Sequence, residues 1–155
     1  MKSFIRPAVE NAFAVLDIPA VRLADADASQ VRGTLNQRFG DGSSPTLHWN
    51  HLRDYVAVQH PDSWRWIAEF VPAEPVYFLF DAQDERAVYQ LPSGRSVVEV
   101  LDECPGFEFY VADENTTYLL AHNDHDYLFG AGTAAPWVAT LEPRHLAWAA
   151  QIRGR

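Results

Sequence analysis

The chain has 155 residues, a formal net charge of −9 and a single cysteine, Cys104, so an internal disulfide and a cysteine-based zinc site are excluded. The hydrophobic fraction of 48% and the aromatic fraction of 13% are typical of a globular protein with a substantial core. The N-terminus lacks the apolar run of a secretory signal, and no segment approaches the roughly 18 apolar residues of a membrane-spanning helix. We therefore expect one cytoplasmic domain, residues 1–155, with no membrane contact.

The acidic side chains are concentrated in one part of the chain. Residues 81–130 hold two basic side chains and eleven carboxylates, a net charge of −9. Residues 1–80 hold seven basic and nine acidic side chains, whereas residues 131–155 have a net charge of +2. Direct contact with nucleic acid is disfavoured, because phosphate binding needs a basic surface. The acidic block either serves solubility alone or forms a docking face for a basic protein partner.

The first 72 residues predict mainly helices. Apolar residues at helical spacing indicate a first helix that starts near Pro7 and ends before Pro19, and a second helix over residues 29–39. Residues 47–59 are either a third helix or an irregular aromatic segment, and residues 64–71 are either a short helix or a strand.

From residue 75 the pattern changes to that of strands. Five short apolar or alternating runs are separated by polar turns, and a helix capped by Ser93 divides the second run from the third. The predicted strands are residues 76–80, 86–91, 107–112, 116–122 and 126–132. We expect an α+β fold with an antiparallel sheet of about four or five strands, residues 75–130, packed against N-terminal and C-terminal helices. The helical front (1–72), the acidic β-rich part (75–130) and two amphipathic C-terminal helices (134–152) form a single domain.

A five-residue segment, HNDHD, concentrates possible metal ligands. The candidate ligands are His122, Asp124, His125 and Asp126, whose imidazoles and carboxylates suit zinc, iron or manganese. Strand alternation places His125 on the opposite side from the other three, so a further ligand such as His48, His51 or His60 is required. Asparagine and aspartate also favour tight turns, so a hairpin turn without a metal is the alternative.

No sequence motif supports catalysis. Cys104 follows two carboxylates, which raise the pKa of a thiol and so disfavour the reactive thiolate. The triplet Gly130-Ala131-Gly132 lacks the rest of a dinucleotide-binding fingerprint. We expect no catalytic residue and no cofactor.

The docking-face hypothesis assigns the contacts with a basic protein to residues of the 81–130 segment. Carboxylates would steer the encounter and pair with Lys or Arg, and tyrosines among them would supply aromatic contacts. The candidate partner-binding residues are Asp84, Glu85, Glu108, Tyr110, Asp113, Glu114, Tyr118, Asp124 and Asp126, with Tyr127 as a further aromatic candidate.

Residues 107–132, FEFYVADENTTYLLAHNDHDYLFGAG, resemble a pattern found in small uncharacterised bacterial domains. In that pattern a FEFY-type strand, a polar turn, an aromatic-aliphatic strand and an N-H-D turn lead to a strand that closes on glycine. The matching positions are Phe107, Phe109, Tyr110, Tyr118, Leu119, Asn123, His125, Asp126 and Gly132. The resemblance implies no established activity. By analogy with small acidic bacterial immunity proteins, it implies an immunity-type or regulatory binding module.

Two other function classes remain open. One is a metal-binding protein or metal-dependent enzyme centred on the HNDHD segment. The other is a structural subunit that oligomerises through some of its tryptophans, namely Trp64, Trp66, Trp137 and Trp148.

Overall fold

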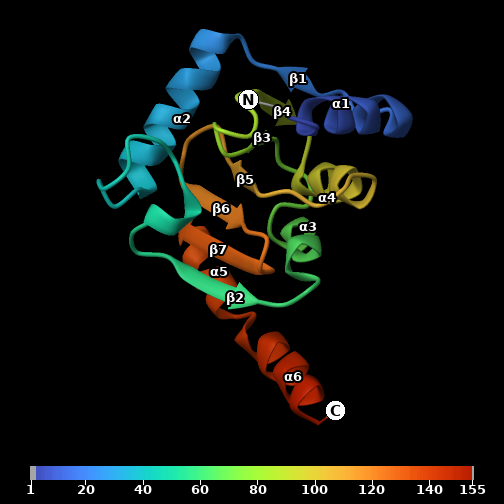
Figure 1. Ribbon diagram of the computed structural model, residues 1–155, viewed down its shortest axis with the longest axis vertical. Coiled ribbons are helices and arrows are strands. Elements are labelled where there is room, and N and C mark those ends of the chain that lie inside the picture. Colours follow the sequence, from blue (N-terminus) through green and yellow to red (C-terminus); the bar gives the residue numbers. More distant parts are fainter. Residues whose placement is uncertain (1–2, 155) are drawn as a thin grey trace.

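The computed structural model describes residues 3–154, which form an antiparallel sheet of seven strands with helices on both faces (Figure 1). The strand order is β1-β4-β3-β5-β6-β7-β2. The strands are β1 (Val21–Arg22), β2 (Val56–Gln59), β3 (Val76–Leu79), β4 (Val88–Leu91), β5 (Phe109–Ala112), β6 (Tyr118–His122) and β7 (Tyr127–Gly132). The helices are α1 (Ile5–Leu16), α2 (Asp25–Phe39), α3 (Ile67–Phe70), α4 (Gly94–Asp102), α5 (Ala134–Ala139) and α6 (Glu142–Arg153), with short 3-10 turns η1 (Trp49–His51) and η2 (Ser63–Trp66).

The predicted α+β class is confirmed, but the described residues form more strands than the expected four or five. The additional strands, β1 and β2, come from the part of the chain predicted to be helical, and they form the two edges of the sheet. An edge strand pairs on one side only and buries few of its side chains. Both residues of β1 are exposed, and β2 buries only Val58. Strand β1 is too short to show a pattern, and the short apolar run of β2, Val56 to Val58, does not distinguish a strand from a helix.

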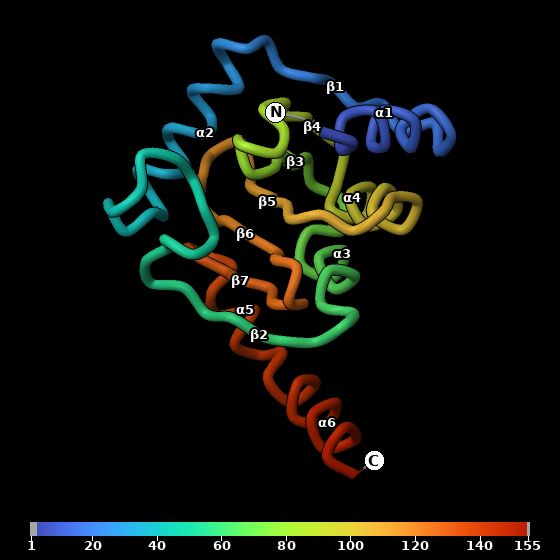
Figure 2. The backbone as a smooth tube through the Cα atoms, in the orientation of Figure 1, coloured from blue at the N-terminus to red at the C-terminus, as the bar shows by residue number. Residues whose placement is uncertain are grey.

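Both faces of the sheet are covered, so the central strands are buried on both sides. Phe109 and Val111 of β5 pack into a core with α1, α3, α4 and α5. Tyr110 and Ala112, which alternate with them, pack into a second core with α2 and the segment that follows it. Helices α1 and α2 accordingly lie on opposite sides of the sheet (Figure 2). The alternation predicted for this strand is confirmed, with the polar side replaced by a second apolar layer.

A side-chain cap explains where helix α4 begins. The hydroxyl of Ser93 accepts a hydrogen bond from the backbone N–H of Ser96 at 3.1 Å, as the sequence predicted.

The last helix, α6, departs from the expectation that the C-terminal helices pack against the sheet. Its predecessor α5 buries Ala134 and Val138, but none of the twelve residues of α6, all within the described part of the chain, is buried. The helix projects from the body of the molecule (Figure 1). Its apolar residues are distributed around the helix rather than along one stripe, so it is not the amphipathic helix that was predicted.

The register of the sheet determines which turns lie together. Leu79 of β3 pairs with Tyr110, and Phe109 pairs with His122. The turn after β3, the start of β5 and the turn after β6 therefore lie at one end of the sheet. The turn between β5 and β6, residues 113–117, lies at the opposite end. No helix within residues 3–154 is long and apolar enough to cross a membrane.

Candidate functional site

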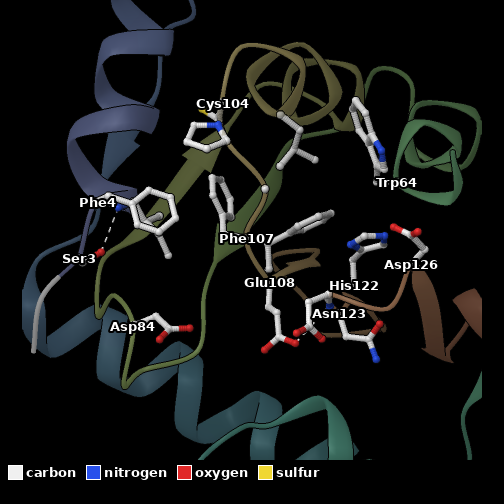
Figure 3. Close-up of a pocket in the computed structure, with 16 residues that line it drawn as sticks. Ser3, Phe4, Trp64, Asp84, Cys104, Phe107, Glu108, His122, Asn123 and Asp126 are labelled. Atoms are coloured by element: carbon white, nitrogen blue, oxygen red, sulfur yellow. Dashed lines mark hydrogen bonds between the residues drawn. The ribbon is translucent and has the colours of Figure 1, made fainter. Parts of the chain in front are cut away.

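A hollow with a volume of about 660 Å³ opens at the end of the sheet where β5 begins and β6 ends. We call it the acidic pocket (Figure 3). It is lined by Ser3, Phe4, Ile5, Trp64, Asp84, Leu101, Cys104, Pro105, Gly106, Phe107, Glu108, Phe109, His122, Asn123, Asp124 and Asp126. Its volume lies within the range of about 300–1,000 Å³ that is usual for ligand sites.

The wall of the acidic pocket is largely aromatic. The ring centroids of Phe4 and Phe107 are 6.3 Å apart, and Phe107 packs edge-on against the buried Phe80 at 5.4 Å. His122 stacks on Phe109 with ring centroids 5.4 Å apart and an interplanar angle of 20°. Figure 3 shows Phe4 and Phe107 on one side of the hollow and His122 below Trp64 on the other. Because most of these rings are tied to the main core, the wall is preformed.

His122 contributes a neutral imidazole to the wall. The residue is 8% exposed, and burial lowers its pKa from 6.5 to about 4. At pH 7 the ring is therefore uncharged, with one nitrogen that donates and one that accepts. Its Nε2 has no hydrogen-bond partner among residues 3–154. An unpartnered buried nitrogen costs stability, and because this atom has almost no accessible surface it does not open into the hollow.

Glu108 lines the pocket just before β5, beside the turn after β6. Its Oε2 accepts a hydrogen bond from the backbone N–H of Asp124 at 3.3 Å. Burial raises the pKa of the Glu108 carboxyl and the nearby Asp124 carboxylate adds to the rise, while the Trp49 side chain and the Asp124 backbone N–H partly oppose it. A raised carboxyl pKa indicates a site where negative charge is incompletely solvated and would gain from a bound cation.

The HNDHD segment is a hairpin turn, which confirms the turn interpretation. The side-chain oxygen of Asn123 accepts from the backbone N–H groups of His125 and Tyr127 at 3.0 and 3.1 Å. Asp126 adopts a left-handed conformation with φ 63°. The side chain of His125 is largely exposed, with its Nε2 3.5 Å from the Asp124 carboxylate. Within residues 3–154 no three His, Cys, Asp or Glu side chains gather into a possible metal site, so the metal hypothesis gains no support.

The remaining histidines proposed as additional ligands lie elsewhere. His60 packs on Trp66, with ring centroids 4.7 Å apart. His48 and His51 line a second hollow of about 380 Å³, where His48 Nε2 lies 3.6 Å from the Asp81 carboxylate. This hollow shares Asp84 and Glu108 with the acidic pocket, so Glu108 faces both.

Three of the predicted partner-binding residues are buried, so they do not form part of the exposed surface. Glu85 is 3% exposed and forms an ion pair with Arg6 at 2.7 Å. Tyr110 is 1% exposed, and its hydroxyl accepts from the backbone N–H of Trp49 at 2.9 Å. Tyr118 packs edge-on against Phe70 in the main core. In each case the residue lies in a strand or turn that is covered on both sides of the sheet, so its side chain faces the interior.

The other predicted residues are divided between the two ends of the sheet. Asp113 and Glu114 lie in the turn after β5, where Asp113 accepts from the backbone N–H of Thr117 at 2.7 Å. Tyr127 is exposed on β7. Four carboxylates line the acidic pocket, namely Asp84, Glu108, Asp124 and Asp126. The single docking face expected from the sequence is therefore split, and only part of it borders a hollow.

Several pocket residues were not identified from the sequence as site residues. Phe4 and Trp64 come from distant segments whose positions depend on the tertiary fold, and Phe107 was noted only for the family resemblance. Cys104 also lines the pocket, and burial followed by the charge of Glu103 raises its pKa. The predicted direction for this thiol is confirmed. The arrangement thus offers an apolar aromatic wall, a neutral imidazole and a set of carboxylates, without an activated nucleophile among the lining residues.

Comparison with known proteins identifies no relative: no family model matches the chain, and neither does any curated protein or solved structure.

Proposed function

We propose that this protein is a non-catalytic binding module whose acidic pocket receives a Lys or Arg side chain of a basic protein partner, as an immunity-type or regulatory protein would. The observation that carries the proposal is the combination of four carboxylates with an aromatic wall in one hollow.

The chemistry of the pocket matches a long cationic side chain. Lys and Arg have apolar stems that pack on hydrophobic surface while the charged head stays in polar surroundings. Phe4 and Phe107 offer aromatic surface on which such a stem or a guanidinium can pack. The Trp64 ring already carries the Arg65 guanidinium, 4.3 Å from its centroid. The carboxylates of Glu108 and Asp124 can accept charge-assisted hydrogen bonds from the cationic head. Arg fits best, because its planar group can pack on an aromatic ring and bind two acceptors at once.

Chemical-shift mapping with a small probe tests this proposal without knowledge of the partner. Uniformly ¹⁵N-labelled protein is titrated with N-acetyl-arginine amide and, in parallel, with N-acetyl-citrulline amide, which has almost the same shape without the charge. We expect the arginine probe to shift the backbone signals of residues 107–109 and 122–126 and the indole signal of Trp64. The citrulline probe should leave them unchanged. The shifts should weaken with added salt, since the attraction is electrostatic.

Two charge-matched variants locate the interaction. Asp84→Asn/Asp124→Asn removes two exposed carboxylates from the acidic pocket, and Glu74→Gln/Glu114→Gln removes two exposed carboxylates at the opposite end of the sheet. The first variant should lose the arginine-specific shifts, and the second should keep them. Equal losses in both variants, or shifts spread over all acidic surfaces, would show that only net charge matters and would refute the pocket.

A further inference from the structure

Helix α6 is attached to the rest of the molecule only near its beginning. Arg144 forms two hydrogen bonds with the Glu69 carboxylate at 2.9 and 2.8 Å, and the His145 ring nitrogen lies 2.7 Å from the Gln59 carbonyl oxygen. Farther along, Trp148 approaches His60 with ring centroids 5.8 Å apart. Beyond that contact the helix extends into solvent (Figures 1 and 2).

This free helix exposes apolar side chains that a partner could cover. Leu146 is 53% exposed. Ile152 near the helix end is 46% exposed but lies on a different side of the helix from Leu146. A helix of twelve residues is only marginally stable in water without tertiary contacts. An external contact along α6 would therefore both bury apolar surface and stabilise the helix.

One face of α6 has the spacing of a helix-pairing seam. Glu142, Leu146, Ala149 and Arg153 follow one another at intervals of four, three and four residues, which places them along one line of the helix. His145 and Trp148, which contact the body, lie on another side, and the half-buried Ala149 lies at the border between that side and the seam. The seam begins with an acidic residue and ends with a basic one. Within the described part of the chain, neither Glu142 nor Arg153 forms an ion pair.

We propose that α6 pairs in antiparallel fashion with the same helix of a second copy of this chain. An antiparallel pair about a twofold axis brings Glu142 opposite Arg153 of the partner subunit at both ends of the seam. It also brings Leu146 opposite Ala149 of the partner subunit, so that a large side chain faces a small one and the helices can approach closely. The charge order of α6, acid first and base last, makes the antiparallel arrangement attractive and the parallel one repulsive.

The dimer should be weak, because two helices of this length bury less surface than a standard interface of about 1,600 Å². Sedimentation velocity from about 10 μM to about 1 mM, a range suited to weak association, tests it on the full chain. We expect the weight-average sedimentation coefficient to rise with concentration from the monomer value toward that of a dimer. A chain that stays monomeric over the whole range would overturn the proposal.

Charge reversal tests the pairing itself. Glu142→Arg alone places two Arg side chains opposite each other and should abolish the concentration dependence, and Arg153→Glu alone should do the same. The double variant Glu142→Arg/Arg153→Glu restores opposite charges and should restore self-association. Failure of the double variant to associate, with α6 still helical by circular dichroism, would contradict the antiparallel seam.

A matched pair of apolar substitutions tests which face of α6 is used. Leu146→Glu introduces a charge on the seam and should abolish self-association, whereas Ile152→Glu introduces the same charge off the seam and should leave it. Equal loss in both variants would indicate a different contact surface and would also overturn the proposal. None of these residues lines the acidic pocket, so the arginine titration remains an independent measurement.

Discussion

Replacing His122 with Phe should remove part of the acid sensitivity of the fold. In the folded protein burial lowers the pKa of His122 to about 4, whereas an unfolded chain has an ordinary histidine pKa of about 6.5. Below pH 6.5 the unfolded state therefore binds a proton that the folded state does not. Stability contributed by the neutral ring is complete above pH 6.5 and is lost as the pH falls toward 4. The difference amounts to about 3 kcal/mol when complete and about 2 kcal/mol at pH 5.

The assay is urea unfolding of the wild type and His122→Phe at pH 7.5 and pH 5. Phenylalanine keeps an aromatic ring where His122 stacks on Phe109, and it has no nitrogen that needs a partner. The free energy of unfolding of the wild type should fall by about 2 kcal/mol more than that of the variant between these two pH values. Both proteins carry the same carboxylates, so the contributions of these groups to the pH dependence of stability cancel in this comparison. An equal fall in the free energy of unfolding of both proteins would refute the reasoning. The control is His125→Phe, at an exposed histidine, which should show the same pH dependence as the wild type.

Two further substitutions test the packing of the fold at the two ends of the sheet. Arg6→Met leaves the Glu85 carboxylate buried without its ion-pair partner. Because the Arg6 side chain is partly exposed, we expect the free energy of unfolding in urea to fall by only about 2 kcal/mol. A fall of less than about 0.5 kcal/mol would mean that water replaces the guanidinium. Gly132→Ala forces a side chain onto a residue with φ +62° and against the Thr117 carbonyl, so the melting temperature should fall by at least about 5 °C. The control Gly33→Ala, in helix α2 with open space around it, should raise the melting temperature, and the same change in both variants would contradict this explanation.

The central part of the fold was predictable because its sequence signals are local. Ser93 caps α4 as expected, and the runs that became β3 to β7 are separated by polar turns. Edge strand β1 has only two residues, and β2, Val56–Gln59, belongs to a segment whose pattern predicts a helix or an irregular segment, because a short apolar run does not distinguish strand from helix. Helix α6 was predicted correctly as a helix, but its lack of packing was not, because contacts with the body depend on the direction in which α5 leaves the sheet.

The site was harder to predict because it depends on strand register. Successive turns of an antiparallel sheet lie at alternate ends, so an acidic block that is continuous in sequence becomes two groups in space. The pairing of Phe109 with His122 brings Glu108 beside the turn that contains Asp124. The same register sends Asp113 to the opposite end. Sequence spacing does not determine this register, and it also cannot show that both faces of β5 are covered, which is why Tyr110 was taken for a surface residue.

Solubility alone accounts poorly for the way in which the carboxylates are arranged. A protein that needs only negative charge gains as much from an exposed side chain such as Glu114 as from any other acid. Glu108 is instead half-buried beside a second carboxylate, and its raised pKa means that its charged form is disfavoured there. A bound cation would offset this cost, whereas a further anion or an apolar ligand would not, and this favours a cation-binding role for the acidic pocket over a general acidic surface.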